Sequence, residues 1–361
     1  MCSNVVMRWD RQRTDREEPA LVGLAGLVRS VRPPDFAGVV FHEVLAKTVL
    51  NRVPESSSMP FRWTVNPYRG CTHGCAYCFA RNSHTYLDFD SGRDFDTQII
   101  VKINAAEALA TRLRSPRWGR EHVAMGTNTD PYQRAEGRYR LMPKIIAALA
   151  DSGTPFSILT KGTLLARDLP LLRAASEQVD VGLAVSIALV DRDLQRSLEP
   201  GTPSPQARLE LVRRISESGL RCGVFVAPVL PGLTDSVERL DSLLADIAEA
   251  GATGVTVLAL HLRPGTREWF AQWLHREHPG LVDGYRALYG SGSYADRRYR
   301  RRLAARAEPL LRKHGLLPKQ GRDVSTGVPG AEDDAAWPAG ALPAGLAGSR
   351  QRVDQEQLTL L

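Results

Sequence analysis

Residues 66–81 read Asn66-Pro-Tyr-Arg-Gly-Cys-Thr-His-Gly-Cys-Ala-Tyr-Cys-Phe-Ala-Arg81, and they hold three of the five cysteines of the chain. The cysteines follow the spacing C-x3-C-x2-C, with the aromatic Tyr77 directly before the last of them. A four-iron cluster normally takes four protein ligands, one for each iron. Three thiolates in one short loop leave one iron open for another molecule. The spacing therefore indicates a site that performs chemistry rather than one that only carries electrons.

A structural zinc site is the alternative for the same cysteines, with His73 or His84 as the fourth ligand. Zinc sites usually combine two C-x2-C-like halves across a longer spacer, and the sequence has no second half of this kind. The other two cysteines, Cys2 and Cys222, are isolated, and Cys222 is expected to be a small core residue. The sequence therefore favours the iron–sulfur interpretation.

The composition limits the class of protein. With 361 residues, 43% of them hydrophobic, the chain is long enough to bury a sizeable core. It has no apolar run of about 18 residues, and its first residues lack the pattern of a secretory signal. Three clustered cysteines argue against a disulfide scaffold and for a reducing compartment. We therefore expect a cytoplasmic protein without a membrane span, and its net charge of +7 suits a nucleic-acid partner.

Short apolar runs alternate with helical patterns from residue 61 onward, which indicates βαβ units and a parallel sheet. The expected strands are 63–66, 99–103, 122–126, 156–160, 181–187, 223–228 and 254–258. The expected helices are 105–114, 143–152, 170–178, 205–218 and 237–250. If 99–103 is an extra strand, six runs remain. The predicted fold class is therefore α/β, a partial (β/α)6 barrel of TIM type, with an N-terminal lead-in and a disordered C-terminal tail.

Polar residues follow several of the expected strands, at the ends where parallel barrels carry their chemistry. Taken singly, most of them are ordinary turn residues. On one face of a barrel, beside the cysteine loop, they indicate a site. They are Cys71, Thr127, Asn128, Asp130, Lys161, Ser186, the segment 228–235, His261 and Arg263.

The residues around the cysteines resemble the radical SAM superfamily. The runs Asn66-Pro-Tyr-Arg-Gly-Cys71 and Tyr77-Cys-Phe-Ala-Arg81 are similar to the branch around spore photoproduct lyase, called "DNA repair photolyase-like", and the resemblance extends over about 60–315. It implies the same barrel fold and a 4Fe-4S cluster on Cys71, Cys75 and Cys78. It also implies that the open iron binds S-adenosylmethionine, which is reductively cleaved to a 5′-deoxyadenosyl radical. A reduced flavodoxin or ferredoxin type of protein would then be the electron donor.

The resemblance also implies contacts to S-adenosylmethionine. The segment 126–133 takes the place of the superfamily's Gly-Gly-Glu, although its residues differ from that pattern. The implied contacts are Thr127, Asn128 and Asp130 for the amino group, Lys161 for the carboxylate, Ser186 for the ribose, and Val226, Pro228 and Tyr77 for the adenine. No catalytic residue toward the substrate is assigned.

One departure from the family concerns the hydrogen donor. Spore photoproduct lyase uses a cysteine close to the segment after the second barrel strand, and residues 124–131 of this chain contain none. Repair of the spore photoproduct by the same route is therefore not expected. Tyr132 and Tyr139 are the side chains considered as alternative radical carriers.

Four regions are expected along the chain. Residues 1–59 form a partly disordered N-terminal extension with a short helix-like stretch at 42–50, and residues 60–290 form the core barrel. Residues 291–317 form a basic helical segment that closes the barrel. Residues 318–361 form a flexible tail with a terminal apolar motif, because Gly, Ala, Pro and acidic residues replace the periodic pattern.

Two segments indicate partners. Six arginines with interleaved tyrosines lie between Tyr294 and Arg306, and the stretch from Arg297 to Arg306 is expected to contact nucleic acid. The alternative is a solvated helix face that packs its leucines inward. The last residues, from Gln357 to Leu361, resemble the short motif by which bacterial repair proteins bind the sliding clamp. A chance ending, or a segment that folds back on the barrel, is the alternative there.

Three functions are compatible with these features. The leading hypothesis is a radical SAM enzyme of the photolyase-like branch that acts on a nucleic acid or nucleotide. The second keeps the enzyme class but changes the substrate to a peptide or a small metabolite. The third is a non-catalytic nucleic-acid-binding protein with a structural metal site.

Overall fold

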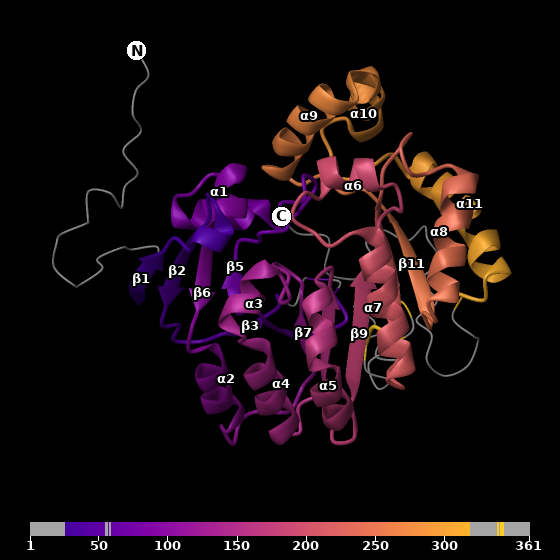
Figure 1. Ribbon diagram of the computed structural model, residues 1–361. Helices are drawn as coiled ribbons and strands as arrows, with labels where there is room; N and C mark the ends of the chain where they lie inside the picture. The colour runs from indigo at the N-terminus through magenta and orange to yellow at the C-terminus, as the bar shows by residue number, and fades with distance from the viewer. Residues whose placement is uncertain (1–25, 55–56, 58, 318–337, 339, 343–361) are drawn as a thin grey trace, which may run out of the picture.

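The computed structural model describes residues 26–54, 57, 59–317, 338 and 340–342 (Figure 1). The predicted clamp-binding motif from Gln357 to Leu361 and most of the predicted tail lie outside the described residues, as do residues 1–25. In the part of the chain that is described, no helix is both long enough and apolar enough to cross a membrane.

A seven-stranded sheet forms the centre of the molecule, in the order β11-β10-β9-β8-β7-β4-β3. Its strands are β3 (Leu50–Arg52), β4 (Trp63–Val65), β7 (Val123–Met125), β8 (Phe156–Thr160), β9 (Val181–Ser186), β10 (Gly223–Val229) and β11 (Gly254–Ala259). Every pair from β4 to β11 is parallel, whereas β3 pairs antiparallel with β4. Because β3 and β11 are not joined, the barrel is open. This confirms the prediction of a partial (β/α)6 barrel.

Helices connect the parallel strands, and all five predicted ones are confirmed to within about two residues. They are α2 (Ala105–Leu113), α4 (Met142–Asp151), α5 (Leu169–Ser176), α7 (Pro205–Glu217) and α8 (Val237–Glu249). Local signals explain the starts of the last two, because Ser204 and Ser236 accept hydrogen bonds from the backbone of the first turn. Their leucine and isoleucine faces pack on the strands in the main core.

A second sheet lies beside the barrel, in the order β1-β2-β6-β5. Its strands are β1 (Leu27–Val31), β2 (Val40–Val44), β5 (Tyr68–Arg69) and β6 (Gln98–Lys102). The predicted extra strand at 99–103 therefore exists, but it belongs to this second sheet. The predicted helix-like stretch at 42–50 is wrong, because the segment contributes to β2 and β3. The polar residues of β2 are satisfied across the sheet: Glu43 pairs with Arg29, and the two ring nitrogens of His42 contact Ser30 and Gln98.

The two faces of the barrel strands pack differently. Val185, Val224 and their neighbours on the outer face belong to the main core with the helices. The inner face has a smaller cluster that includes Ala184 and Phe225. Its third buried member is Ala341 of the predicted tail, and Leu183 N donates a hydrogen bond to Gly340 O over 2.9 Å. The structure therefore differs from the predicted flexible tail at Pro338 and residues 340–342, which pack against the starts of β9 and β10.

Other helices join or follow the strands of the two sheets. They are α1 (Arg93–Thr97), α3 (Arg134–Tyr139), α6 (Arg192–Leu198), α9 (Thr266–Glu277), α10 (Val282–Tyr289) and α11 (Arg297–Lys313), with the 3-10 helices η3 (Arg81–Leu87) and η4 (Thr163–Asp168). Helices α9 and α10 lie together at the top of the molecule in Figure 1, above α6. Helix α11 packs on α8 and β11 and buries Leu303 and Leu311. It therefore takes the position of the helix that follows the last barrel strand.

Candidate active site

The three clustered cysteines lie in the loop between β5 and η3. Cys71 and Cys75 are buried, Cys78 is partly buried, and all three thiols are free. The end of α6 and the segment after it hold this loop through their backbone: Ala76 N donates to Leu198 O, and Gly201 N donates to His73 O, both over 2.9 Å. A side chain at Gly201 would bring a Cβ to 2.0 Å from Thr72 O. The close approach of these two backbones therefore requires a glycine there.

Arg81, the last residue of the motif, fixes the loop from one side. Its guanidinium is fully buried and donates to Cys75 O over 2.8 Å and to Gly92 O over 2.7 Å. It also pairs with Asp96 at 3.0 Å and lies 5.0 Å from the ring centre of Trp269. A planar fork with five donors suits this set of partners, and a lysine could not replace it. From the sequence, Arg81 could be recognised only as part of a motif, and its role in bracing the cysteine loop was missed.

The segment after β7 fixes the loop from the other side. Thr129 Oγ1 donates to Gly70 O over 2.7 Å, and Gln133 Nε2 donates to the same oxygen over 3.0 Å. Gln133 Oε1 accepts from Thr72 N over 2.9 Å. The segment begins at Gly126, where φ is +92° and an added Cβ would lie 1.9 Å from Leu159 O. The predicted segment therefore reaches the cysteine loop, through side chains that were not singled out.

Asp130 joins this segment to the end of β8 and to the cysteine loop. Its carboxylate accepts from Lys161 N over 2.6 Å and from Thr160 Oγ1 over 2.5 Å, and it pairs with His73 Nδ1 at 3.3 Å. Burial alone would raise the pKa of Asp130, but the His73 charge and these hydrogen bonds lower it. Burial likewise opposes the charged form of His73, yet its neighbours Cys71 and Asp130 raise its pKa to about 10. Both oxygens of Asp130 are thus engaged within the protein.

Three of the residues predicted for the carboxylate, ribose and adenine come together: Lys161 after β8, Ser186 at the end of β9, and Tyr77 of the cysteine loop. Lys161 Nζ donates to Ser186 Oγ over 2.9 Å and lies 5.7 Å from the ring centre of Tyr77. Ser186 Oγ in turn contacts Ala227 O at 3.2 Å. A cation, a hydroxyl and an aromatic ring thus converge next to the cysteine loop.

A buried ion pair supports this group. The hydroxyl of Tyr77 donates to Glu199, which pairs with Arg208 Nη2 at 2.5 Å, and Arg208 Nη1 donates to Ser186 O over 3.0 Å. Glu199 and Arg208 are both 0% exposed. Burial alone would raise the pKa of Glu199, but Arg208 and Lys161 lower it. Sequence reasoning missed this pair, because nothing local connects residues 199 and 208 to a tyrosine more than a hundred positions away.

The four other residues predicted to contact the cofactor differ in how far they are buried and in which face of the barrel they lie on. Thr127 Oγ1 is buried and has no hydrogen-bond partner among the described residues, whereas Asn128 is exposed. The side chain of Val226 is fully buried in the core that the strands share with the helices. Ala227, its neighbour, lies on the inner face with Phe225. Only the backbone of Val226 is thus available to a ligand in the barrel, whereas Pro228 follows at the end of β10.

The two histidines considered as a fourth zinc ligand have other partners in the structure. Among the residues described, no three His, Cys, Asp or Glu side chains converge as the ligands of a metal ion. A zinc ion holds all its ligands within about 2.3 Å of one point, whereas a cluster spreads its thiolates over separate irons. His73 is held by Asp130, and His84 Nε2 contacts Gln98 O at 2.9 Å. Three free thiols in one braced loop fit a cluster, and the buried Thr127 hydroxyl, which has no partner among the described residues, fits a polar ligand.

The two tyrosines considered as radical carriers have partners of their own. Tyr132 is 1% exposed and its hydroxyl donates to Asp168 over 3.1 Å. Burial, with the nearby Asp168 charge, raises the pKa of Tyr132 well above its usual value. The Tyr139 hydroxyl donates to Glu43 over 3.0 Å. Cys222 is fully buried, as its prediction as a core residue requires.

Comparisons with known proteins agree with this geometry. The family model described as "Radical SAM superfamily" matches residues 65–255. An uncharacterized protein of Mycobacterium tuberculosis is 60% identical over 317 residues, which cover 86% of this chain and 93% of the relative. A protein of Pseudomonas phage M6, described as a radical SAM Nalpha-GlyT isomerase, is 25% identical over 50% of this chain and 36% of its own length.

Solved structures show the same fold. Spore photoproduct lyase complexed with dinucleoside spore photoproduct superposes with a TM-score of 0.56, at 16% identity over 77% of this chain and 80% of that chain. A mutant of the same enzyme with bound AdoMet and dinucleoside spore photoproduct gives 0.57 over the same shares, also at 16% identity. The family model covers more than half of the chain and the cysteine loop lies within it, so this protein belongs to the radical SAM superfamily.

Proposed function

We propose that this protein is a radical SAM enzyme of the spore photoproduct lyase-like branch that acts on nucleic acid. Cys71, Cys75 and Cys78 would hold a 4Fe-4S cluster, and S-adenosylmethionine would bind at its open iron. With both bound, reductive cleavage supplies a 5′-deoxyadenosyl radical that abstracts hydrogen from the substrate. Thiols in this role stay reduced in the cytoplasm, where we place the enzyme.

The side chains at the strand ends would orient the cofactor. Lys161 supplies a cation for its carboxylate, and Ser186, beside it, supplies a hydroxyl for the ribose. The unpartnered Thr127 hydroxyl is available to a polar group of the ligand. Glu199 fixes the Tyr77 hydroxyl and so sets the position of the ring that Lys161 faces. These contacts support the assignment of the cofactor to the interior of the barrel.

The observation that carries the nucleic-acid proposal is Phe79, which directly follows Cys78 and is 42% exposed. Arg263, after β11, covers its ring at 5.5 Å. A second aromatic ring beside an arginine involves His261, two positions before Arg263. The ring of Tyr294 stacks on that of His261 with 4.2 Å between the ring centres, and the Arg300 guanidinium lies 5.7 Å from the centre of the Tyr294 ring. Exposed aromatic rings are platforms on which unpaired bases stack, and arginines beside them add cation–π contacts.

Helix α11 adds a phosphate-binding surface to these platforms. Arg297, Arg298, Arg301 and Arg302 are exposed, and none of them forms an ion pair with a described carboxylate. The lower half of the helix differs, because Arg306, Arg312 and Lys313 pair with acids. Exposed arginines that have no carboxylate partner among the described residues and lie on successive turns of one helix can contact successive phosphates of a nucleic-acid backbone. The complex of the similarly folded spore photoproduct lyase with a dinucleoside supports a substrate of this class.

Deuterium transfer tests the substrate class. Reconstituted protein is incubated anaerobically with S-adenosylmethionine, dithionite and perdeuterated oligonucleotides or perdeuterated peptides, and the 5′-deoxyadenosine is analysed by mass spectrometry. The proposal predicts deuterium from the oligonucleotides. Transfer from peptides alone would support the alternative of a peptide substrate, and a protein that makes no 5′-deoxyadenosine would refute the enzyme class.

Substitution of Phe79 tests the surface. Phe79→Ala removes a stacking platform worth about 1–3 kcal/mol per base, so oligonucleotide affinity should fall by about tenfold or more. Cleavage of S-adenosylmethionine without substrate reports whether the cysteine loop stays intact. Tyr86→Ala is the matched control, because this ring is also exposed, at 79%, but lies at the far end of η3. Equal loss of affinity in both variants would contradict the role of Phe79.

A further inference from the structure

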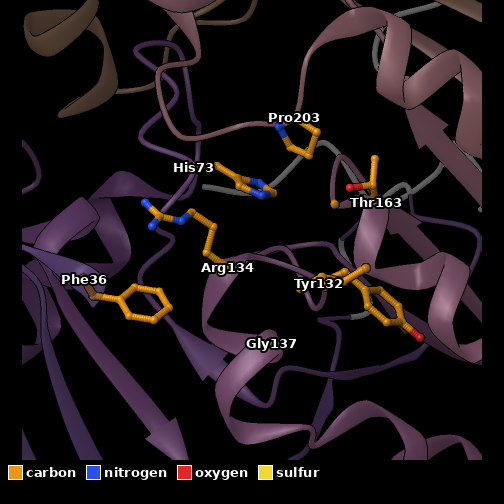
Figure 2. A pocket seen from close by; sticks show the side chains of 9 residues that line it. Phe36, His73, Tyr132, Arg134, Gly137, Thr163 and Pro203 are labelled. Carbon is orange, nitrogen blue, oxygen red and sulfur yellow. The ribbon is translucent and has the colours of Figure 1, made fainter. Parts of the chain in front are cut away.

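A cavity of about 270 Å³ is lined by His73 of the cysteine loop together with residues of α3 and of the segment after β8. Figure 2 shows His73 and Pro203 above it, with Tyr132 and Arg134 below and Phe36 to one side. Lys161 points to Ser186 and Tyr77, whereas the next residues, 162–164, line this cavity. The cavity is therefore separate from the group of residues assigned to the cofactor.

His73 connects the cavity to the cysteine loop. It lines the cavity and stands two positions after Cys71, within the cysteine loop itself. Its ring is held by Asp130 at 3.3 Å, and its side chain is 3% exposed. One fixed aromatic side chain of the loop thus lines a surface hollow. This is a short path for an electron between a molecule seated in the hollow and the cysteine loop.

Exposed arginines lie on helix α3, whose Arg134 lines the cavity, and the exposed acid on this side is Asp35, whose backbone oxygen accepts a hydrogen bond from Arg134. Arg134, Arg138 and Arg140, on α3 and at its end, are exposed, and none forms an ion pair with a carboxylate of the described residues. The one acid of α3, Glu136, is fully buried and pairs with Arg167 at 2.8 Å. Helix α3 therefore presents arginines with no exposed acid on the same helix to offset them. Such a surface attracts a partner with an acidic face.

We propose that the cavity and the arginines of α3 form the docking site for an acidic one-electron carrier protein. The inference rests on the proposed function, because reductive cleavage requires one electron for each S-adenosylmethionine. The carrier is oxidised by one electron and the cluster is reduced by one, so the exchange balances without a further reactant. The site brings the carrier to His73 of the loop, apart from the group of residues assigned to the cofactor.

Two observations favour a protein partner over nucleic acid at this surface. The only aromatic ring beside Arg134 among the described contacts is Phe36, which is partly buried and covered by the guanidinium at 5.0 Å. Its lower exposure makes it a poorer platform for a base than Phe79, which is 42% exposed. In addition, α3 and the arginine-rich α11 lie far apart in Figure 1. A short nucleic-acid segment bound at α11 would therefore not also contact α3.

The test compares two reductants in one assay. The variant Arg134→Glu/Arg138→Glu and the wild type are reconstituted, and 5′-deoxyadenosine formation is measured with reduced flavodoxin or with dithionite. Electrostatic association rates change by about tenfold or more when a matching patch is reversed, so the flavodoxin-driven rate should fall by about that factor. The dithionite-driven rate should stay within about twofold of wild type, because a small chemical reductant needs no docking site.

The control variant is Arg112→Glu/Arg114→Glu, which reverses two exposed arginines at the end of α2. It should keep both rates. An α3 variant that keeps its flavodoxin-driven rate, or loses both rates equally, overturns the docking site. Loss of oligonucleotide binding instead of flavodoxin-driven turnover also overturns it and assigns the surface to nucleic acid. Failure of the wild type with dithionite is a different result, because it refutes the proposed function itself.

Discussion

The buried pair of Glu199 and Arg208 offers the most quantitative prediction. Both side chains are 0% exposed and lie 2.5 Å apart, and Arg208 also holds the carbonyl of Ser186. Arg208→Met leaves the Glu199 carboxylate buried with its strongest partner removed. Loss of one member of a buried pair costs about 3–5 kcal/mol. For a chain of this size, that lowers the thermal midpoint by about 10 °C.

The double variant Glu199→Gln/Arg208→Met is the matched control. It removes both charges together, so its stability should lie within about 2 kcal/mol of wild type. Midpoints are measured on the metal-free protein under reducing conditions by tryptophan fluorescence, for which the chain has six tryptophans. The single variant Glu199→Gln completes the cycle. If the double variant loses as much stability as Glu199→Gln and Arg208→Met summed, the two charges are not coupled and the prediction is refuted.

Three further substitutions test how the loop and the barrel are held. Arg81→Lys replaces a five-donor fork by one ammonium group, so the iron content after reconstitution should fall by about tenfold; full iron content would contradict the bracing role. Gly126→Ala places a Cβ 1.9 Å from Leu159 O at a φ of +92°, and a midpoint equal to wild type would show that the backbone there is not constrained. We expect the free energy of unfolding of Gly126→Ala to be lower than that of wild type by about 1–3 kcal/mol or more. Gly182→Val would bring a Cβ to 2.5 Å from Ala341 O, so limited proteolysis after residue 317 should be about fivefold faster; an unchanged cleavage rate would argue against the contact.

The parallel barrel could be predicted because its signals are local. Apolar runs and amphipathic helices repeat along the chain, and serine caps mark helix starts such as that of α7. The stretch at 42–50 failed for the opposite reason. His42 and Glu43 are polar, and what makes them strand residues is hydrogen bonding to Ser30, Gln98 and Arg29 in other strands. A single-sequence pattern does not contain those partners.

The same distinction applies to the candidate site. Lys161 and Ser186 could be predicted to meet because parallel strands end at one edge, and their 2.9 Å contact agrees with that expectation. The supports of the site could not be predicted. Glu199 meets Tyr77, and Arg81 meets Asp96 and Trp269, through side chains from separate elements. The packing of Ala341 against Ala184 and Phe225 could not be predicted either, because it depends on tertiary contacts alone.

The central claim is that three cysteines hold a cluster whose open iron binds S-adenosylmethionine. The direct measurement is 5′-deoxyadenosine formation by anaerobically reconstituted protein with S-adenosylmethionine and dithionite, for the wild type and for Cys71→Ala, Cys75→Ala and Cys78→Ala. Cys222→Ala is the control for loss of a cysteine outside the loop. We predict product from the wild type and the control, and none from the three loop variants. Product from any of the loop variants at the wild-type rate, or a wild type that binds iron and sulfide but makes no product, would contradict the account.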